Sequence, residues 1–370
     1  FASVASLVVA VVFLDSYFQP GRAVDREAAR PVSLDVWLYN KDWIPYLRAF
    51  EEQNGKISLE IRTFRSYERL YKELTASISA KNAPQLVELN SLYGIATIAR
   101  TGALLSLPDE LTRELAPNVV SYFRYRDGQW AIPLGASLPV LFYNKDLLKY
   151  SGAGDGMGIA GWKEVGLAGK EWVRSASEKS FGEHWGVVSD DEVLWYFLNL
   201  SPDWEADSLR ESLNLWRSLI HEDGIMPPLR HHLAASDFID RKSVFFLSSS
   251  DKRTLLEKFI GGKFSFGMIG LPETSHMYAK VDGFGVIAAT ADKERMAIAC
   301  IRYLIDRPVQ DRLLRDIAKL PVLNDTIGQL KAAPDLDEKD RFLIGLSENI
   351  EPRFPTDEDV ARRERLEQAV

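Results

Sequence analysis

The sequence offers few residues arranged for covalent chemistry. Ser249 and Lys252 have the spacing of a serine nucleophile and its lysine in one class of acyl-transfer enzymes, but no SDN or KTG segment accompanies them. We therefore interpret the pair as part of a polar turn before a helix. Of the five histidines, no two stand four residues apart around a carboxylate, so we expect no metal site and no cofactor.

A glycine-rich stretch at residues 151–161 contains Gly156, Gly158 and Gly161 at the spacing of a dinucleotide-binding loop. That motif needs a strand directly before it and a helix that opens within it. Here a helical segment separates the glycines from the nearest apolar strand. The stretch is interpreted as a loop.

Aromatic residues are numerous, with 9 Trp, 13 Tyr and 18 Phe, and many stand beside Ser, Asn or Gly in predicted loops. Flat aromatic faces next to neutral hydrogen-bonding groups suit a polyhydroxylated small molecule. The net charge of −8 has the wrong sign for a protein that neutralises nucleic-acid phosphates. The single cysteine, Cys300, excludes internal disulfides and cysteine-based zinc sites.

The first residues predict a targeting segment. Residues 2–14 form an uncharged apolar run that is shorter than the ~20 residues of a membrane-spanning helix. Small residues at Gly21 and Ala23 favour cleavage after Ala23, which makes residues 1–23 a signal peptide. An uncleaved membrane anchor remains the alternative. Because no cysteine follows the apolar run, lipid anchoring is not expected, and both interpretations point outside the cytoplasm.

The first half of the chain alternates between strand and helix periodicity. Residues 34–38 alternate as a strand, and apolar residues then recur at helical spacing over residues 43–50. A strand at 57–63, a helix at 67–78 and a short buried strand at 85–89 follow. This order predicts a parallel sheet in an α/β protein, and a length of 370 residues favours two domains.

The second half is predicted from similar patterns. Residues 130–144 read as extended but contain two prolines, which favours an edge or crossing segment over a central strand. A capped helix begins at residue 208, strands are expected at 264–269 and 283–289, and a helix covers 297–305.

The order of these segments resembles the family 1 extracellular solute-binding proteins that serve ABC importers of sugars and glycerol phosphates. The resemblance covers residues 33 to about 365, and it is carried by LRAFEEQNGKISLEIRTFRSYERLYKELTASISAKNAPQLVEL, TGALLSLPD, DGQWAIPLGASLPVLFYNKDLLKYSG, LNLWRSLIHEDGIMPP, FIDRKSVFFLSSS, VDGFGVIAAT and CIRYLIDRPVQDRLLRDIAKLPVLNDT. It implies a type II periplasmic-binding-protein fold with two α/β lobes around a ligand cleft. The lobes are expected at residues 31–137 with 284–320, and at 138–283 with 321–370.

Several candidate ligand-binding residues lie where predicted strands end. Ligands of open parallel sheets gather at the carboxyl ends of strands. Tyr39 and Asn40 follow the first strand, Glu88 ends the third, and Ser137 lies on the crossing segment. A carboxylate among apolar neighbours, such as that of Glu88, is costly to bury unless it is hydrogen-bonded, which favours a polar cleft.

The resemblance itself implies further site residues. Tyr67 aligns with a ligand-contacting tyrosine of the glycerol-phosphate group, and Trp195 matches a tryptophan of the second lobe that stacks on ligand. The serine run supplies Ser249 and Ser250 as hydrogen-bonding candidates, and Gly283 and Gly285 could supply backbone amides to a phosphate. Core packing remains the alternative for both aromatic residues.

The nature of the cargo is left open between a sugar, a polyol and a sugar phosphate. Glu88 in the cleft would oppose a phosphate dianion, and spacing does not choose among the tail arginines Arg353, Arg362 and Arg363. We therefore expect an uncharged sugar rather than glycerol 3-phosphate.

The leading hypothesis is a non-enzymatic, monomeric binding protein that works outside the cytoplasm and delivers a small ligand to the membrane permease of an ABC importer. A membrane-tethered ligand sensor or accessory protein of the same fold is the first alternative. A hydrolase that uses the serine run is the second.

Overall fold

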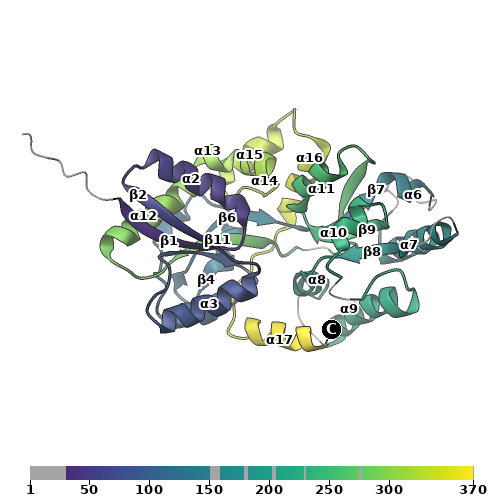
Figure 1. Ribbon diagram of the computed structural model, residues 1–370, viewed down its shortest axis with the longest axis horizontal. Helices are drawn as coiled ribbons and strands as arrows, with labels where there is room; N and C mark the ends of the chain where they lie inside the picture. The colour runs from purple at the N-terminus through teal and green to yellow at the C-terminus, as the bar shows by residue number, and fades with distance from the viewer. Residues whose placement is uncertain are drawn as a thin grey trace, which may run out of the picture.

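The computed structural model describes residues 31–150, 159–178, 182–201, 206–228, 231–274 and 277–369. The predicted signal peptide and residues 151–158 of the glycine-rich stretch lie outside the described residues. Two lobes, each built on its own sheet, lie side by side along the long axis of the molecule (Figure 1). This arrangement confirms the prediction of a two-lobe α/β protein.

The sheet of the first lobe has the strand order β2-β1-β3-β11-β6. Its strands are β1 (Val32–Leu38), β2 (Ile57–Thr63), β3 (Leu86–Asn90), β6 (Ile132–Ser137) and β11 (Lys280–Val286). The strands β1, β2 and β3 pair in parallel, as the alternation of strand and helix predicted, whereas β11 runs antiparallel to its neighbours β3 and β6.

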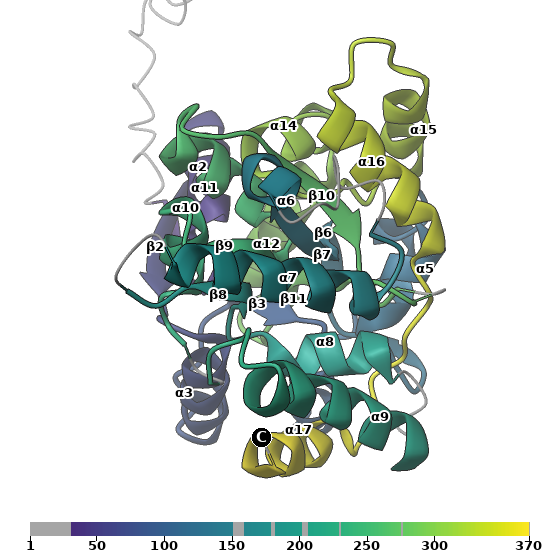
Figure 2. The ribbon, with the colours of Figure 1, turned by 90° about the vertical axis from the view of Figure 1, so that its right-hand side faces the viewer.

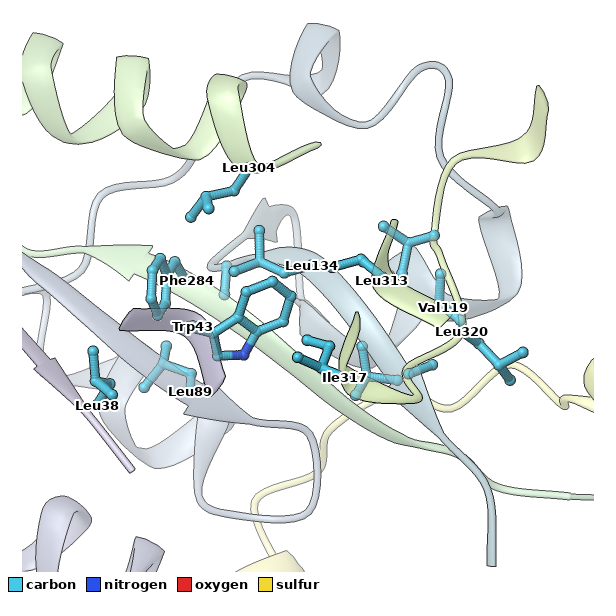
Figure 3. Packing of buried hydrophobic residues seen from close by; sticks show 14 of the residues in the cluster. Leu38, Trp43, Leu89, Val119, Leu134, Phe284, Leu304, Leu313, Ile317 and Leu320 are labelled. Carbon is cyan, nitrogen blue, oxygen red and sulfur yellow. The ribbon is translucent and has the colours of Figure 1, made fainter. Parts of the chain in front are cut away.

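Helices cover both faces of this sheet, with α2 and α3 on opposite sides (Figure 1). The helices of the first lobe are α2 (Ile44–Gln53), α3 (Tyr67–Ser79), α4 (Ile95–Arg100), α5 (Pro117–Val120) and α12 (Ala291–Ile305). Ser66 caps α3 by accepting a hydrogen bond from the amide of Arg69, which fixes where this helix begins. Trp43 is completely buried and packs in the core near Leu89, Leu134 and Ile317 (Figure 3).

The sheet of the second lobe has the strand order β10-β7-β9-β8. Its strands are β7 (Pro139–Asn144), β8 (Trp185–Ser189), β9 (Ser243–Ser249) and β10 (Phe266–Gly270). The surrounding helices are α6 (Lys145–Tyr150), α7 (Trp162–Ser177), α8 (Val193–Leu200), α9 (Ala206–Arg217), α10 (Ala234–Ile239) and α11 (Lys252–Ile260). The helix α7 packs across this sheet (Figure 2). It lies closest to β8 where Gly169 faces Gly186. A Cβ added to Gly186 would lie only 2.6 Å from the Cα of Gly169, so the close approach requires glycine.

The prolines of residues 130–144 occupy two different positions. Pro133 lies in β6, an edge strand, as predicted. The prediction is wrong for β7, which lies in the interior of the second sheet between β10 and β9. Pro139 is the first residue of β7, a position where a missing backbone N–H is tolerated.

The chain crosses between the lobes at the end of β6, where Leu138 alone separates β6 from β7. The return crossing lies between β10 and β11. The expected lobe boundary at residues 283 and 284 falls inside β11, which belongs entirely to the first sheet, so the return crossing precedes Lys280.

A third crossing follows α14 (Leu313–Ile317), where Leu320 pairs with Ala136 of β6 and Val322 accepts a hydrogen bond from the amide of Ala116. The last helices are α13 (Arg307–Gln310), α14 (Leu313–Ile317), α15 (Asn324–Ala332), α16 (Glu338–Leu346) and α17 (Asp359–Ala369). The helix α16 packs on the second lobe, where Asp340 pairs with Arg253 of α11 at 2.7 Å. The tail then returns to the first lobe, where Tyr122 donates a hydrogen bond to the carbonyl of Glu351.

Candidate functional site

A cleft of about 680 Å³ is lined by residues of both lobes. The segments that follow β1 and β2 contribute Tyr39, Asn40, Lys41, Asp42, Arg65 and Tyr67. The second lobe contributes Glu192, Asp251 just before α11, and residues along one side of α11, including Lys252, Thr254, Lys258 and Phe259. Lys280 and Asp282 of β11 and Lys319 of the third crossing complete the lining. The cleft thus meets the carboxyl ends of the parallel strands of the first lobe, as expected for an open sheet.

Glu88 binds, through its carboxylate, three residues of the first lobe that line the cleft. Its Oε2 accepts hydrogen bonds from the backbone amides of Tyr39 at 2.7 Å and Asn40 at 2.9 Å, and its Oε1 accepts one from the Tyr67 hydroxyl. The carboxylate is completely buried. Burial and the nearby charge of Asp282 raise the pKa of Glu88 to about 7. Glu88 therefore holds the loop after β1 against Tyr67 and does not line the cleft.

Lys319 joins the two lobes through charge. Its ammonium lies 2.8 Å from Asp282 of the first sheet and 3.1 Å from Asp251, which precedes α11 of the second lobe. Ser137, at the first crossing, also lies 3.1 Å from this ammonium. Burial alone would lower the pKa of Lys319, but Asp282 and Asp251 hold it above its ordinary value, so the ammonium stays charged.

The carboxylates around Lys319 are held by several donors. Asp282 accepts hydrogen bonds from Asn40 Nδ2 at 3.2 Å and from the indole of Trp43 at 3.3 Å. Burial would raise the pKa of Asp251, but Lys319, Lys280 and Lys252 hold it well below its ordinary value. These contacts hold the side chains of Lys319, Asp251 and Asp282 in place.

Lys280 of β11 forms a second ion pair between the lobes, with Glu192 of the second lobe. Its ammonium lies 3.0 Å from Glu192 and 5.1 Å from the centre of the Trp195 ring. Trp195 itself is completely buried and donates a hydrogen bond from its indole to the carbonyl of Tyr278 at 2.7 Å. Trp195 therefore lies behind Lys280, and its role as a stacking surface for ligand stays a prediction.

The structure brings together some of the expected site residues and separates others. Tyr39, Asn40 and Tyr67 line the cleft, while Glu88 and Ser137 contact residues that line it.

The serine and glycine candidates do not line the cleft: Ser249, Gly283 and Gly285 lie in packed strands, and Ser250 lies in the turn after β9. Ser249 and Ser250 are completely buried, and Ser250 accepts a hydrogen bond from the amide of Leu138. A Cβ on Gly283 would meet the Phe123 ring at 2.7 Å, and one on Gly285 would meet Leu89 at 2.8 Å. These glycines allow close packing of β11, and an amide role toward a phosphate stays a prediction for them.

The tail arginines contact the protein itself. Arg353 donates a hydrogen bond to the carbonyl of Ser91 at 2.9 Å and pairs with Asp359 at 3.2 Å. Arg362 pairs with Glu358 at 3.0 Å. The side chain of Arg363 lies outside the described residues. Neither Arg353 nor Arg362 lines the cleft.

Sequence reasoning missed the charged residues that dominate the cleft, namely Lys280, Asp282, Lys319, Asp251 and Glu192. The strand expected at residues 283–289 begins three residues earlier, at Lys280. The available signal was the pair Lys280 and Asp282 between apolar residues of one strand. Buried charges need partners, so this pattern indicates a site where charged side chains meet.

Within the described part of the chain, no group of three or more His, Cys, Asp or Glu residues is placed to hold a metal ion. Of the helices that the structure describes, none has both the length and the apolar composition needed to cross a membrane.

Comparisons with known proteins agree with this architecture. No curated protein sequence matches the chain. An ABC substrate-binding protein from Listeria monocytogenes in complex with cycloalternan superposes with a TM-score of 0.73 at 16% identity, over 90% of each chain. The maltose/maltodextrin-binding domain MalE from Bdellovibrio bacteriovorus, bound to maltotriose, has a TM-score of 0.74 at 18% identity, over 89% of this chain and 91% of that one.

UgpB from Mycobacterium tuberculosis, in complex with glycerophosphocholine, has a TM-score of 0.69 at 16% identity, over 82% of this chain and 85% of that one. At these identities the likeness concerns the fold, and it confirms the expected two-lobe binding-protein architecture. The family model described as bacterial extracellular solute-binding protein matches residues 46–336, which is most of the chain. The protein belongs to the family of bacterial extracellular solute-binding proteins.

Proposed function

We propose that this protein captures a carbohydrate or a related polyol in the cleft between its lobes and delivers it to the permease of an ABC importer. The observation that carries this proposal is the construction of the cleft from both lobes, with polar side chains from each wall held in place by buried hydrogen bonds and ion pairs. Convergent polar groups that are fixed before binding lose little conformational freedom when a ligand arrives.

Family membership supports the proposal, since extracellular solute-binding proteins work outside the cytoplasm. The solved structures of similar fold hold cycloalternan, maltotriose and glycerophosphocholine. Cleavage after Ala23 or retention of the segment as a tether stays a prediction, and the mass of the protein secreted by its own host would distinguish the two.

Binding without turnover is part of the proposal. The hydrolase alternative requires an accessible serine, but Ser249 is completely buried and its hydroxyl lies outside the cleft lining. We therefore keep the serine run as a structural feature of β9.

The test is a thermal-shift panel of oligosaccharides, polyols and glycerol phosphates, followed by calorimetry and product analysis on any hit. A ligand at 100 times its dissociation constant should stabilise the protein by about 2.7 kcal/mol. The hit should be recovered chemically unchanged after long incubation. Failure of the whole panel with well-folded protein would reject carbohydrate capture, and conversion of the hit to a product would reject the non-enzymatic role.

A further inference from the structure

The charges of the cleft do not balance. Glu192 is paired with Lys280, and Asp251 and Asp282 share Lys319. Four further cations line the same cleft, namely Lys41, Arg65, Lys252 and Lys258. Among the described residues, none of these four forms an ion pair with a carboxylate, and Asp42 is the one lining carboxylate that is left without a lysine or arginine partner.

The positive excess is local. The chain as a whole carries a net charge of −8, whereas basic residues outnumber acidic residues among those that line the cleft. A concave site lined by one sign of charge concentrates ligands of the opposite sign.

The excess cations stand on both walls. Lys41 and Arg65 follow β1 and β2 of the first lobe, whereas Lys252 and Lys258 lie on α11 of the second lobe. Burial raises the pKa of Asp42, and Lys319 and Lys252 oppose that rise across the cleft. The charge of Lys252 therefore acts on the opposite wall. Like charges on two facing walls repel when the lobes approach, and an anion between them removes that repulsion.

Glu88, the carboxylate that argued against an anionic ligand, does not line the cleft. Glu88 accepts its hydrogen bonds from Tyr39, Asn40 and Tyr67 and lies behind the lining, so the expectation of an uncharged sugar loses its basis.

Building on the function proposed above, we propose that the ligand is an anionic saccharide whose carboxylate, sulfate or phosphate groups lie between Lys41 and Arg65 on one wall and Lys252 and Lys258 on the other. The hydroxyl groups of the saccharide would meet the fixed polar groups at the floor of the cleft, including Asn40 and Asp251.

Calorimetry with two matched pairs of probes tests this proposal. Trigalacturonate is compared with its methyl ester, and trehalose 6-phosphate with trehalose, so that the members of each pair share a sugar skeleton and only one member carries charge, and the two pairs separate carboxylate from phosphate. At least one anionic probe should bind about tenfold more tightly than its neutral partner at low salt. The difference should shrink at high sodium chloride, because mobile ions screen charge pairs.

Variants identify the cations responsible. Lys252→Gln and Lys41→Gln should each weaken binding of the anionic probe severalfold and weaken binding of the neutral probe much less, whereas Lys263→Gln, at an exposed position outside the cleft, should change neither. Lys258→Gln and Arg65→Gln, also exposed, replace any variant that fails to fold.

Two results would overturn the inference. Equal or tighter binding of neutral saccharides would overturn the anionic preference and leave carbohydrate capture intact. Absence of binding by every charged and neutral saccharide, with normal circular dichroism, would overturn both.

Discussion

The ammonium of Lys319 lies 2.8 Å from Oδ2 of Asp282, and both side chains are almost entirely shielded from solvent. Lys319 belongs to the third crossing and Asp282 to the first sheet, while the same ammonium reaches Asp251 of the second lobe at 3.1 Å. One buried cation thus connects both lobes at the base of the cleft.

Replacement of Lys319 by methionine should destabilise the protein strongly. The substitution leaves Asp282 and Asp251 buried without their cation, and removing one partner of a buried pair costs about 3–5 kcal/mol in the free energy of unfolding. Lys331→Met is the matched control, because Lys331 pairs with Glu348 on the surface, where a pair contributes less than about 1 kcal/mol. Urea unfolding of both variants checks the prediction, which is contradicted if the two losses are equal.

Glu88→Gln should flatten the dependence of stability on pH. The pKa of Glu88 is about 7 in the folded protein against 4.5 as its ordinary value. The folded state therefore binds the proton more tightly than the unfolded state. The associated stability is fully present below pH 4.5 and is lost as the pH rises through about 7, a change of roughly 3 kcal/mol at most.

Urea unfolding of the wild type and of Glu88→Gln at a series of pH values measures this effect. Glutamine has nearly the same shape and never ionises, so its curve should lack the decline between pH 4.5 and 7. Parallel curves for the two proteins would show that Glu88 does not titrate in this range.

Trp195→Ala should lower the free energy of unfolding by about 3–5 kcal/mol, because a fully buried indole leaves a cavity. Trp195→Phe keeps most of the volume and gives up the hydrogen bond to Tyr278, at a cost of about 1 kcal/mol plus the volume lost. Affinity for a confirmed ligand is measured on the folded Phe variant. Normal affinity would reject ligand stacking on this ring, whereas a large loss of affinity at normal stability would support it.

Gly186→Ala and Gly328→Ala should have opposite effects. A Cβ on Gly186 would clash with the backbone of Gly169 and push α7 from β8, which costs about 1–3 kcal/mol. Gly328 lies in α15, where a Cβ meets nothing within 4 Å, so alanine should stabilise by roughly 0.5–1 kcal/mol. Thermal unfolding compares the two, and a tolerated Gly186→Ala would contradict the close contact.

Ligand binding should draw the lobes together. The lobes are joined by narrow crossings, and contacts from both walls of the cleft form fully only when it closes. Small-angle scattering with a saturating confirmed ligand should show a smaller radius of gyration than the free protein, and a saccharide that does not bind serves as control. An unchanged radius at saturation would mean that the lobes do not hinge.

The sequence by itself determined the first three strands, the helices between them and the order in which they occur. Period-two alternation at residues 34–38 and 57–63 and the helical stripe at 67–78 depend only on which side chains face a core, so the parallel arrangement of β1, β2 and β3 followed directly. Strand ends also indicated Tyr39 and Asn40, because the topology of an open sheet fixes where its ligands lie.

Only the tertiary structure decided which charges meet. Lys319 and Asp251 are separated by 68 residues, and no periodic pattern links them, since ion pairs arise from packing of distant segments. The same holds for β7, whose interior position in the second sheet depends on its partners β9 and β10 rather than on its own prolines. Local periodicity is encoded in neighbouring residues, whereas the charge balance of the cleft depends on side chains that only the complete fold brings together.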